Sequence, residues 1–157
     1  MANRAILVAP LFVALALLLP GCVGPYKAYE GPTLPASKIS IVEGLYAYST
    51  TLRSRADLTH EHTITVEEID GEENSRAKYG SAYQVSPGQH IAKVRYDHKF
   101  LGSVNRTVKF TSEAGHRYIF AAVRRGARSY IWVVDITKDG LYFVKRGKVI
   151  AGEMPPS

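Results

Sequence analysis

Short runs in which apolar and polar side chains alternate constrain the fold of this chain more than any other feature of its sequence. The most regular run spans residues 90–100. Its apolar positions are Ala92, Val94 and Tyr96, and its polar positions are Lys93, Arg95, Asp97 and Lys99. Because successive side chains of a β-strand point to opposite faces, this run predicts an antiparallel strand with one face buried and the other in water.

Other strand-like segments occur along the chain, at residues 38–42, 45–48, 62–69, 79–85, 104–110, 116–123, 130–136, 141–144 and 149–150. Turn signals that contain glycine separate several of them, at residues 70–71, 87–88, 112–115, 124–128 and 138–140. Beyond the N-terminal apolar run, the sequence shows no helical period. We therefore predict an all-β fold, an antiparallel β-sandwich of about seven to nine short strands, with a small barrel as the alternative.

The first part of the chain has the pattern of an export signal. Arg4 supplies a positive charge, residues 5–19 are apolar and uncharged, and the small residue Gly21 precedes Cys22. A membrane-spanning helix needs about 20 apolar residues, and Pro10 would remove a helical hydrogen bond inside this shorter run. The pattern therefore predicts a cleaved signal rather than a membrane span.

The quartet Leu19-Pro20-Gly21-Cys22 resembles the lipobox of bacterial lipoproteins. The resemblance implies that residues 1–21 are a signal peptide, that the bond between Gly21 and Cys22 is cut, and that a diacylglycerol is attached to the Cys22 sulfur. Lipidation would also account for a single cysteine, which cannot form an internal disulfide. The alternative is an ordinary signal peptide followed by an incidental cysteine.

The residue after the cysteine bears on the final location of the protein. Val23 is not acidic, and within the lipoprotein family this is similar to the pattern of proteins that are sent to the outer membrane. The resemblance therefore implies the periplasmic face of the outer membrane, in a bacterium with two membranes. Because two or three acyl chains hold a protein on a bilayer far more firmly than one chain, we expect a permanent anchor.

Composition divides the chain after the signal into a tether, one domain and a tail. Residues 22–37 are rich in proline and glycine, which predicts a lipidated N-terminus followed by a flexible linker. Residues 38–151 hold the strand-like segments and are predicted to form the sandwich, which at this size does not depend on disulfides. Residues 152–157 are predicted to be a disordered tail.

Three segments resemble parts of small exported β domains of the PEGA and transthyretin-like kind. They are residues 64–71, which end in Asp70-Gly71, residues 86–91, which contain Pro87-Gly88-Gln89-His90, and residues 110–118, which contain Ala114-Gly115 and Tyr118. The resemblance implies a β-sandwich. It implies less about function, because those families are largely binding, surface or uncharacterised proteins.

The formal net charge of +6 at pH 7 bears on the choice of partner. An exported protein meets anionic lipid headgroups and cell-wall polymers, so we expect no nucleic-acid partner. A candidate binding patch for phosphates or for an acidic partner consists of Arg124, Arg125 and Arg128, with Lys145, Arg146 and Lys148 later in the chain. The alternative is that these charges are simply solvated.

Two histidines have a spacing that metal sites use. His60 and His62 would point the same way in an extended segment. Further ligands would have to come from His90, His98 or His116. No second ligand pair of recognised spacing is present, so exposed or hydrogen-bonded histidines are the favoured alternative, and no cofactor is expected.

Tyrosine pairs are candidates for stacking on sugar rings. Tyr46 with Tyr48, or Tyr79 with Tyr83, would share one face of a strand. Tyrosine is also a good strand residue with an amphipathic tip, and this structural interpretation is the favoured one.

The sequence contains no motif with the spacing of a known catalytic site, such as Gly-x-Ser-x-Gly, a phosphate-binding glycine loop or His-Glu-x-x-His. We therefore expect a protein that is not an enzyme but a membrane-anchored accessory or interaction module, whose partner is an envelope protein or a cell-wall component. The second hypothesis is a ligand-binding module for a glycan or a metal ion. An enzyme is the third.

Overall fold

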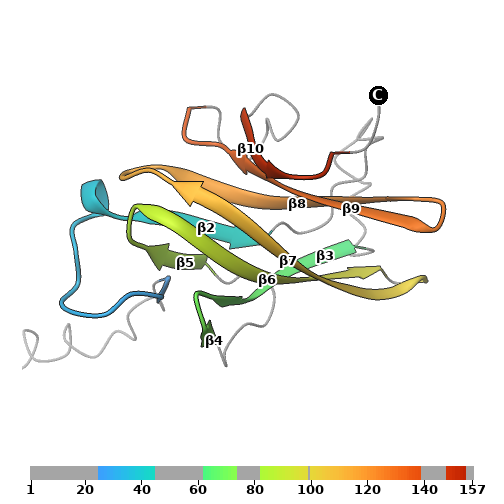
Figure 1. Cartoon of the computed structure of the whole chain (residues 1–157), viewed down its shortest axis with the longest axis horizontal. Coiled ribbons are helices and arrows are strands. Elements are labelled where there is room, and N and C mark those ends of the chain that lie inside the picture. The colour runs from blue at the N-terminus through green and yellow to red at the C-terminus, as the bar shows by residue number, and fades with distance from the viewer. Residues whose placement is uncertain (1–24, 45–61, 74–81, 99, 139–147, 155–157) are drawn as a thin grey trace, which may run out of the picture.

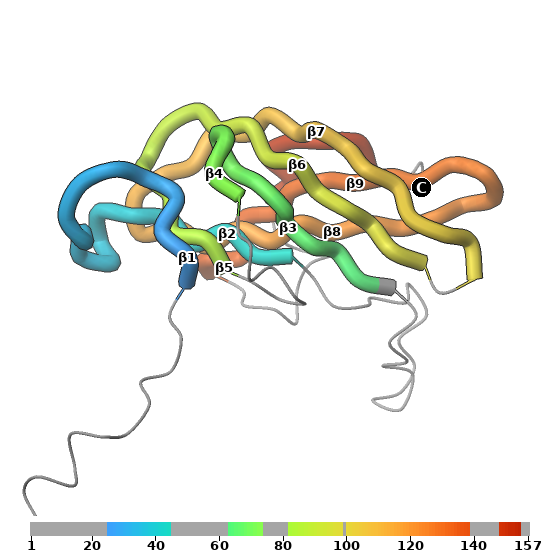
Figure 2. Tube along the Cα trace, turned by 90° about the horizontal axis from the view of Figure 1, so that it is seen from below, coloured from blue at the N-terminus to red at the C-terminus, as the bar shows by residue number. Residues whose placement is uncertain are grey.

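The chain folds into two β-sheets that pack face to face (Figures 1 and 2). The computed structural model describes residues 25–44, 62–73, 82–98, 100–138 and 148–154. The predicted all-β sandwich is confirmed. Within the described ranges, no helix combines the length and the apolar character that crossing a membrane requires.

The described residues contain ten strands and one short 3-10 helix, rather than the predicted seven to nine strands. In chain order they are β1 (Tyr26–Lys27), η2 (Ala36–Lys38), β2 (Ser40–Gly44), β3 (His62–Ile69), β4 (Glu72–Glu73), β5 (Ala82–Val85), β6 (Gly88–His98), β7 (Gly102–Ser112), β8 (Arg117–Arg125), β9 (Arg128–Asp135) and β10 (Lys148–Gly152). Two of them, β1 and β4, are only two residues long. Strands this short carry no detectable alternation in a sequence.

One sheet has the strand order β1-β5-β2-β8-β9-β10, and the other has the order β4-β3-β6-β7. The second sheet is antiparallel throughout the described pairs. The first sheet departs from the predicted antiparallel pattern at two places, because β1 runs parallel to β5 and β2 runs parallel to β8. Parallel neighbours need a long connection, and all four strands of the second sheet lie in sequence between β2 and β8.

The predicted strand at residues 90–100 is the long strand β6, which pairs with β7 from Gly88↔Ser112 to His98↔Gly102. Its apolar positions Ala92, Val94 and Tyr96 are at most 1% exposed. The strand ends earlier than predicted, at His98, so Phe100 lies in the turn and is 69% exposed. The alternation therefore placed the buried face correctly and misplaced only the end of the strand.

The core lies between the two sheets and contains many aromatic rings. Its largest fully buried side chains include Tyr83, Tyr96, Tyr118 and Phe120. Phe110 of the second sheet meets Phe120 of the first edge to face, with ring centroids 5.8 Å apart and an interplanar angle of 88°. Full burial of one such side chain contributes roughly 1.5–3 kcal/mol, so the sandwich is held mainly by this apolar layer.

A buried tyrosine also links the two sheets through a hydrogen bond. The register of β3 against β6 shifts between Val66 and Glu68, which is a β-bulge. The Tyr83 hydroxyl, on β5 of the other sheet, donates to the carbonyl oxygen of Glu67 at this bulge, at 2.9 Å. Because Tyr83 is 0% exposed, it belongs to the core and cannot form part of a sugar-binding surface. Its proposed companion, Tyr79, lies outside the described residues.

The segment predicted to be a flexible linker contributes to the fold. Tyr26 and Lys27 form β1 beside β5, and the Ala28 N–H donates to the Gln84 carbonyl oxygen at 2.9 Å. The Tyr26 ring packs edge-on against the buried ring of Tyr83, with centroids 5.4 Å apart. At the other end of the chain, the Glu153 N–H donates to the Ile131 carbonyl oxygen at 2.9 Å. The folded unit therefore extends beyond the predicted range 38–151 on both sides.

Candidate functional site

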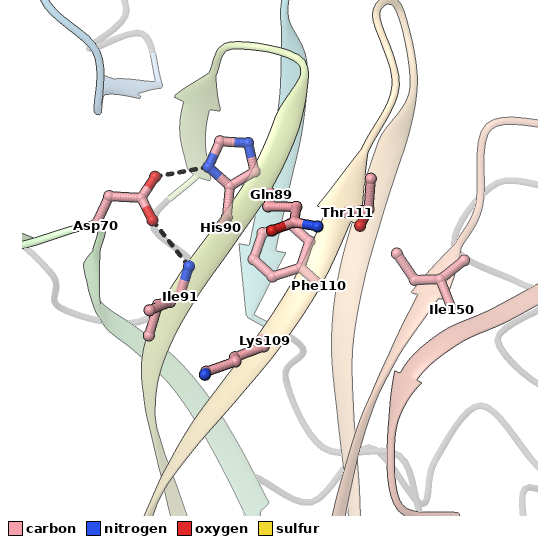
Figure 3. A pocket seen from close by; sticks show the side chains of 8 residues that line it. All are labelled: Asp70, Gln89, His90, Ile91, Lys109, Phe110, Thr111 and Ile150. Carbon is pink, nitrogen blue, oxygen red and sulfur yellow. Dashed lines mark hydrogen bonds and ion pairs between the residues drawn. The ribbon is translucent and has the colours of Figure 1, made fainter.

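Two hollows lie along one side of the sandwich, where edge strand β7 of one sheet runs beside β9 and β10 of the other. The larger, of about 480 Å³, is lined among others by Asp70, Gln89, His90, Lys109, Thr111 and Ile150 (Figure 3). The smaller, of about 240 Å³, is lined among others by Arg106, Thr107, Lys109, Ser129, Ile131 and Glu153. Lys109 lines both, and we call the two hollows together the seam groove.

At one end of the seam groove, the Asp70 carboxylate connects the end of β3 to β6 (Figure 3). Asp70 begins the Asp-Gly turn and adopts a positive φ of 54°, which aspartate tolerates better than most residues. One carboxylate oxygen, Oδ1, accepts a hydrogen bond from the Ile91 N–H at 2.8 Å. The other, Oδ2, lies 2.6 Å from Nδ1 of His90. The turn that the sequence signals is therefore tied to the first residues of β6.

The other ring nitrogen of His90 lies near two serines. Nε2 is 2.7 Å from the Ser86 carbonyl oxygen and 3.1 Å from Oγ of Ser112, and the Ser112 hydroxyl also donates to the Ser86 carbonyl at 3.1 Å. A carbonyl oxygen only accepts hydrogen bonds, so Nε2 carries a proton and donates it. Both ring nitrogens of His90 thus face hydrogen-bond acceptors, with Nδ1 next to the Asp70 carboxylate.

His90 lies between Asp70 and Ser112, as the histidine of a Ser-His-Asp triad lies between its two partners. The geometry differs, however, in the hydrogen bond that the imidazole Nε2 makes. In a triad the imidazole Nε2 accepts the serine proton. Here Nε2 donates to a backbone carbonyl, and both His90 and Ser112 are buried, at 5% and 3% exposed. The arrangement joins the start of β6 to the end of β3, the turn at Ser86 and the end of β7, which is a structural role.

The sequence predicts a site role only for His90, as a possible additional metal ligand, and none for Asp70 or Ser112. A signal for the cluster was nevertheless present, because Asp70, His90 and Ser112 each fall within one of the three segments that carry the resemblance to small exported β domains. The tertiary structure brings these three segments to one end of the sandwich.

The remaining histidines are spread over other elements. Nδ1 of His116 lies 2.7 Å from Oδ2 of Asp135, and its ring stacks on Tyr118. His98 lies at the far end of β6, where its backbone is in register with that of His62. His60 and the side chain of His62 lie outside what the structure describes. Among the described residues, no group of three or more His, Cys, Asp or Glu side chains is placed to hold a metal ion.

Among the carboxyl groups that the structure describes, that of Asp135 has a pKa clearly lower than usual. Burial by itself raises this pKa. The carboxylate accepts hydrogen bonds from the Thr137 hydroxyl at 2.6 Å and the Thr137 N–H at 2.9 Å, and it lies beside the His116 ring. These interactions outweigh burial and hold the pKa below its usual range. A carboxyl of this kind stabilises the fold most strongly above its unfolded-state pKa, and the contribution is lost as the pH falls through the lower folded-state value.

We therefore expect the replacement Asp135→Asn to cost stability at neutral pH and progressively less on acidification. The difference in the free energy of unfolding between wild type and variant should be largest above about pH 5 and shrink as the pH falls below the unfolded-state pKa of an aspartate, which is about 3.9. Urea unfolding at a series of pH values measures this difference. A difference that stays constant with pH would contradict the assigned direction of the shift.

The three arginines of the patch predicted from the sequence lie together at the β8–β9 turn, where Arg125 is in register with Arg128. Arg124 donates to the carbonyl oxygens of Leu101, at 3.0 Å, and Gly126, at 3.1 Å, so it links the β6–β7 and β8–β9 turns. Arg128 pairs with Glu153 and lies over the Tyr130 ring, 5.1 Å from its centroid. Both side chains thus have structural contacts.

The lysine predicted to complete the patch lies elsewhere. Lys148 is in register with Asp135 at the other end of β9 from Arg128. A strand rises about 3.3 Å per residue, so the two ends of β9 are roughly 23 Å apart, and the prediction that Lys148 joins the arginines is wrong. Arg125 is exposed at the end of β8. Lys145 and Arg146, like Tyr46 and Tyr48, fall outside the described residues.

Comparisons of the chain with family profiles, with curated proteins and with solved structures return no significant match. The similarities to lipoprotein signals and to PEGA and transthyretin-like domains therefore remain predictions from the sequence.

Proposed function

We propose that this protein is a lipid-anchored lipoprotein of the bacterial envelope, with its anchor at Cys22, and that its β-sandwich acts as a non-catalytic module that binds another envelope component. The observation that carries the proposal is the quartet Leu19-Pro20-Gly21-Cys22 at the end of a charged and then apolar leader. The periplasmic face of the outer membrane is the proposed location, because Val23 is not acidic.

The position of the first strand supports a short connection between anchor and domain. Strand β1 starts at Tyr26, four positions after Cys22. Four residues span at most about 14 Å when fully extended. A lipidated Cys22 would therefore hold the β1 end of the sandwich close to the bilayer. The turns at β6–β7 and β8–β9, which lie at the opposite end in Figure 2, would then point away from the membrane.

The non-catalytic role is supported by the His90 cluster. The cluster contains the three residue types of a catalytic triad. However, His90 Nε2 donates its proton to the Ser86 carbonyl, so it has no free lone pair to accept a proton from a substrate. The second candidate function is glycan binding, and the seam groove favours it because polar and apolar side chains line it together.

The anchor is tested by following lipid attachment directly. We expect cells grown with labelled palmitate to label the wild-type protein and the control variant Val23→Ala, and to leave Cys22→Ser unlabelled. Mass spectrometry of the N-terminal peptide should find Cys22 as the first residue with a diacylglycerol on its sulfur. An unmodified Cys22 in the wild-type protein, or equal membrane retention of Cys22→Ser after its signal is removed, would overturn the anchor.

A further inference from the structure

Two hairpin turns, one from each sheet, lie side by side at the end of the sandwich opposite β1 (Figures 1 and 2). The β6–β7 turn carries Phe100 and Leu101, and the β8–β9 turn lies between Arg125 and Arg128, which are in register. Arg124 joins the two turns, because its Nη1 donates to the Leu101 carbonyl oxygen at 3.0 Å. We call these five residues the hairpin tip.

The apolar part of the hairpin tip is strongly exposed. Phe100 is 69% exposed and Leu101 is 50% exposed. Single exposed apolar side chains are common on protein surfaces and need no explanation, but two large ones next to each other at a protruding turn form a contiguous apolar surface. Aromatic side chains and arginine are also enriched at the centre of protein interfaces, where most of the binding energy arises. The composition of the hairpin tip is therefore that of a binding surface.

The turn that carries the apolar pair is held in place by its own contacts. The Leu101 N–H donates to the His98 carbonyl oxygen at 3.2 Å, and the Phe100 N–H donates to His98 Nδ1 at 3.2 Å. The His98 and Phe100 rings also meet edge to face, with centroids 6.4 Å apart. A surface that is already ordered loses less conformational entropy when it binds. The turn is thus prepared to act as a rigid knob.

The arginines give the hairpin tip a positive charge. Arg124 donates to two backbone carbonyl oxygens, which carry no net charge to balance its guanidinium. Arg125 is exposed at the end of β8. Arg128 pairs with Glu153, but both side chains are more than half exposed, and exposed ion pairs contribute little to stability. Carboxylates of a partner can therefore approach Arg125 and compete with Glu153 for Arg128.

We propose that the hairpin tip docks into an apolar pocket rimmed by carboxylates on another envelope protein, with Phe100 and Leu101 inside the pocket and Arg125 and Arg128 at its rim. A protruding turn is convex and fits a concave partner, and the arginines call for negative charge around it. An anionic lipid surface has the same charge. However, the proposed anchor holds the β1 end at the bilayer, so the hairpin tip points away from it. In this respect the inference rests on the proposed function.

The test is photocross-linking in intact cells that make the full-length, lipidated protein. Photoreactive benzoylphenylalanine is incorporated at position 100, and at position 91 as the matched control. Ile91 is also an exposed apolar residue, at 45%, but it lies near the start of β6, at the other end of the strand from Phe100. We expect position 100 to cross-link one envelope protein and position 91 to cross-link little or none of it. Mass spectrometry should place the attachment in a region of that protein that contains Asp or Glu.

Charge variants add a readout that an accidental apolar contact would not produce. Arg125→Glu should lower the yield of cross-linked product from position 100 about tenfold without changing the melting temperature, because like charges would then face each other across the interface. Arg125→Lys keeps the charge and should retain most of the product. Lys38→Glu reverses an exposed charge on η2, at the other end of the sandwich (Figure 1), and should leave the yield unchanged.

Cross-linking from position 100 to a lipid, to a second copy of this chain or to nothing would overturn the proposal, as would an unchanged yield with Arg125→Glu. Palmitate labelling of the same position-100 variant separates these failures from a failure of the anchor, because the label reports on Cys22. Cross-linking of an envelope protein from position 91 alone would leave the interaction module standing and exclude the hairpin tip as its binding surface.

Discussion

Replacement of His90 by alanine is expected to lower the free energy of unfolding by about 3 kcal/mol or more, because removal of a large buried ring costs this much before any hydrogen bond is counted. The ring is 5% exposed and lies 5.3 Å from the Phe110 ring, centroid to centroid. Its loss would also leave the Ser86 carbonyl with only the Ser112 hydroxyl as partner and would break the pairing with Asp70.

Urea unfolding of His90→Ala measures this cost, and His98→Ala is the matched control. His98 lies on the same strand but is only partly buried, at the end of β6 next to an exposed turn. Its removal should cost about 1 kcal/mol or less, as is usual for substitutions away from the core. If the two variants were equally stable, the His90 cluster would not be the structural tie that its contacts indicate.

Gly44→Ala is expected to lower the free energy of unfolding by about 3 kcal/mol or more through overpacking. Gly44 is buried on β2, and a Cβ built on it would overlap the carbonyl oxygen of Ile64 on β3. This is a contact between the two sheets, and the obstacle is backbone rather than a flexible side chain. Either the sheets must separate at this point or β3 must shift, and both would disturb the packed core.

The control for this variant is Gly31→Ala. Gly31 has a positive φ of 93°, but a Cβ there would meet nothing within 4 Å. The expected cost is only about 1 kcal/mol, the usual penalty for an alanine in a left-handed conformation. Thermal unfolding of both variants separates crowding from backbone strain. A loss for Gly44→Ala no greater than that for Gly31→Ala would show that the sheets can move apart locally at little cost.

The alternation in residues 90–100 was sufficient to predict β6 and its buried face, because the side-chain period of a strand is a local property. It failed at the end of the strand. Phe100 continues the apolar period in sequence, yet the chain turns after His98 and leaves Phe100 exposed. Where a hairpin turns depends on its partner strand, and here β7 begins only at Gly102.

Strand β1 shows the opposite case. Residues 22–37 have the composition of a linker, and two residues carry too little pattern to predict a strand. Tyr26 and Lys27 are nevertheless held in the sheet by pairing with β5 and by the contact of Tyr26 with Tyr83. The stabilising partner is more than 50 positions away in the chain, so no local analysis would have found it.

Some features of the candidate site could likewise be predicted from the sequence, whereas others depend on the folded chain. Local pattern was enough to predict the type of fold, the buried face of the longest predicted strand and the turns at Asp70-Gly71 and Pro87-Gly88, because all of these depend on the conformational preferences of neighbouring residues. The contacts among Asp70, His90 and Ser112, and the separation of Lys148 from the arginines, became visible only in the folded chain. Those relations arise from strand order and sheet packing, which bring together residues that no local preference connects.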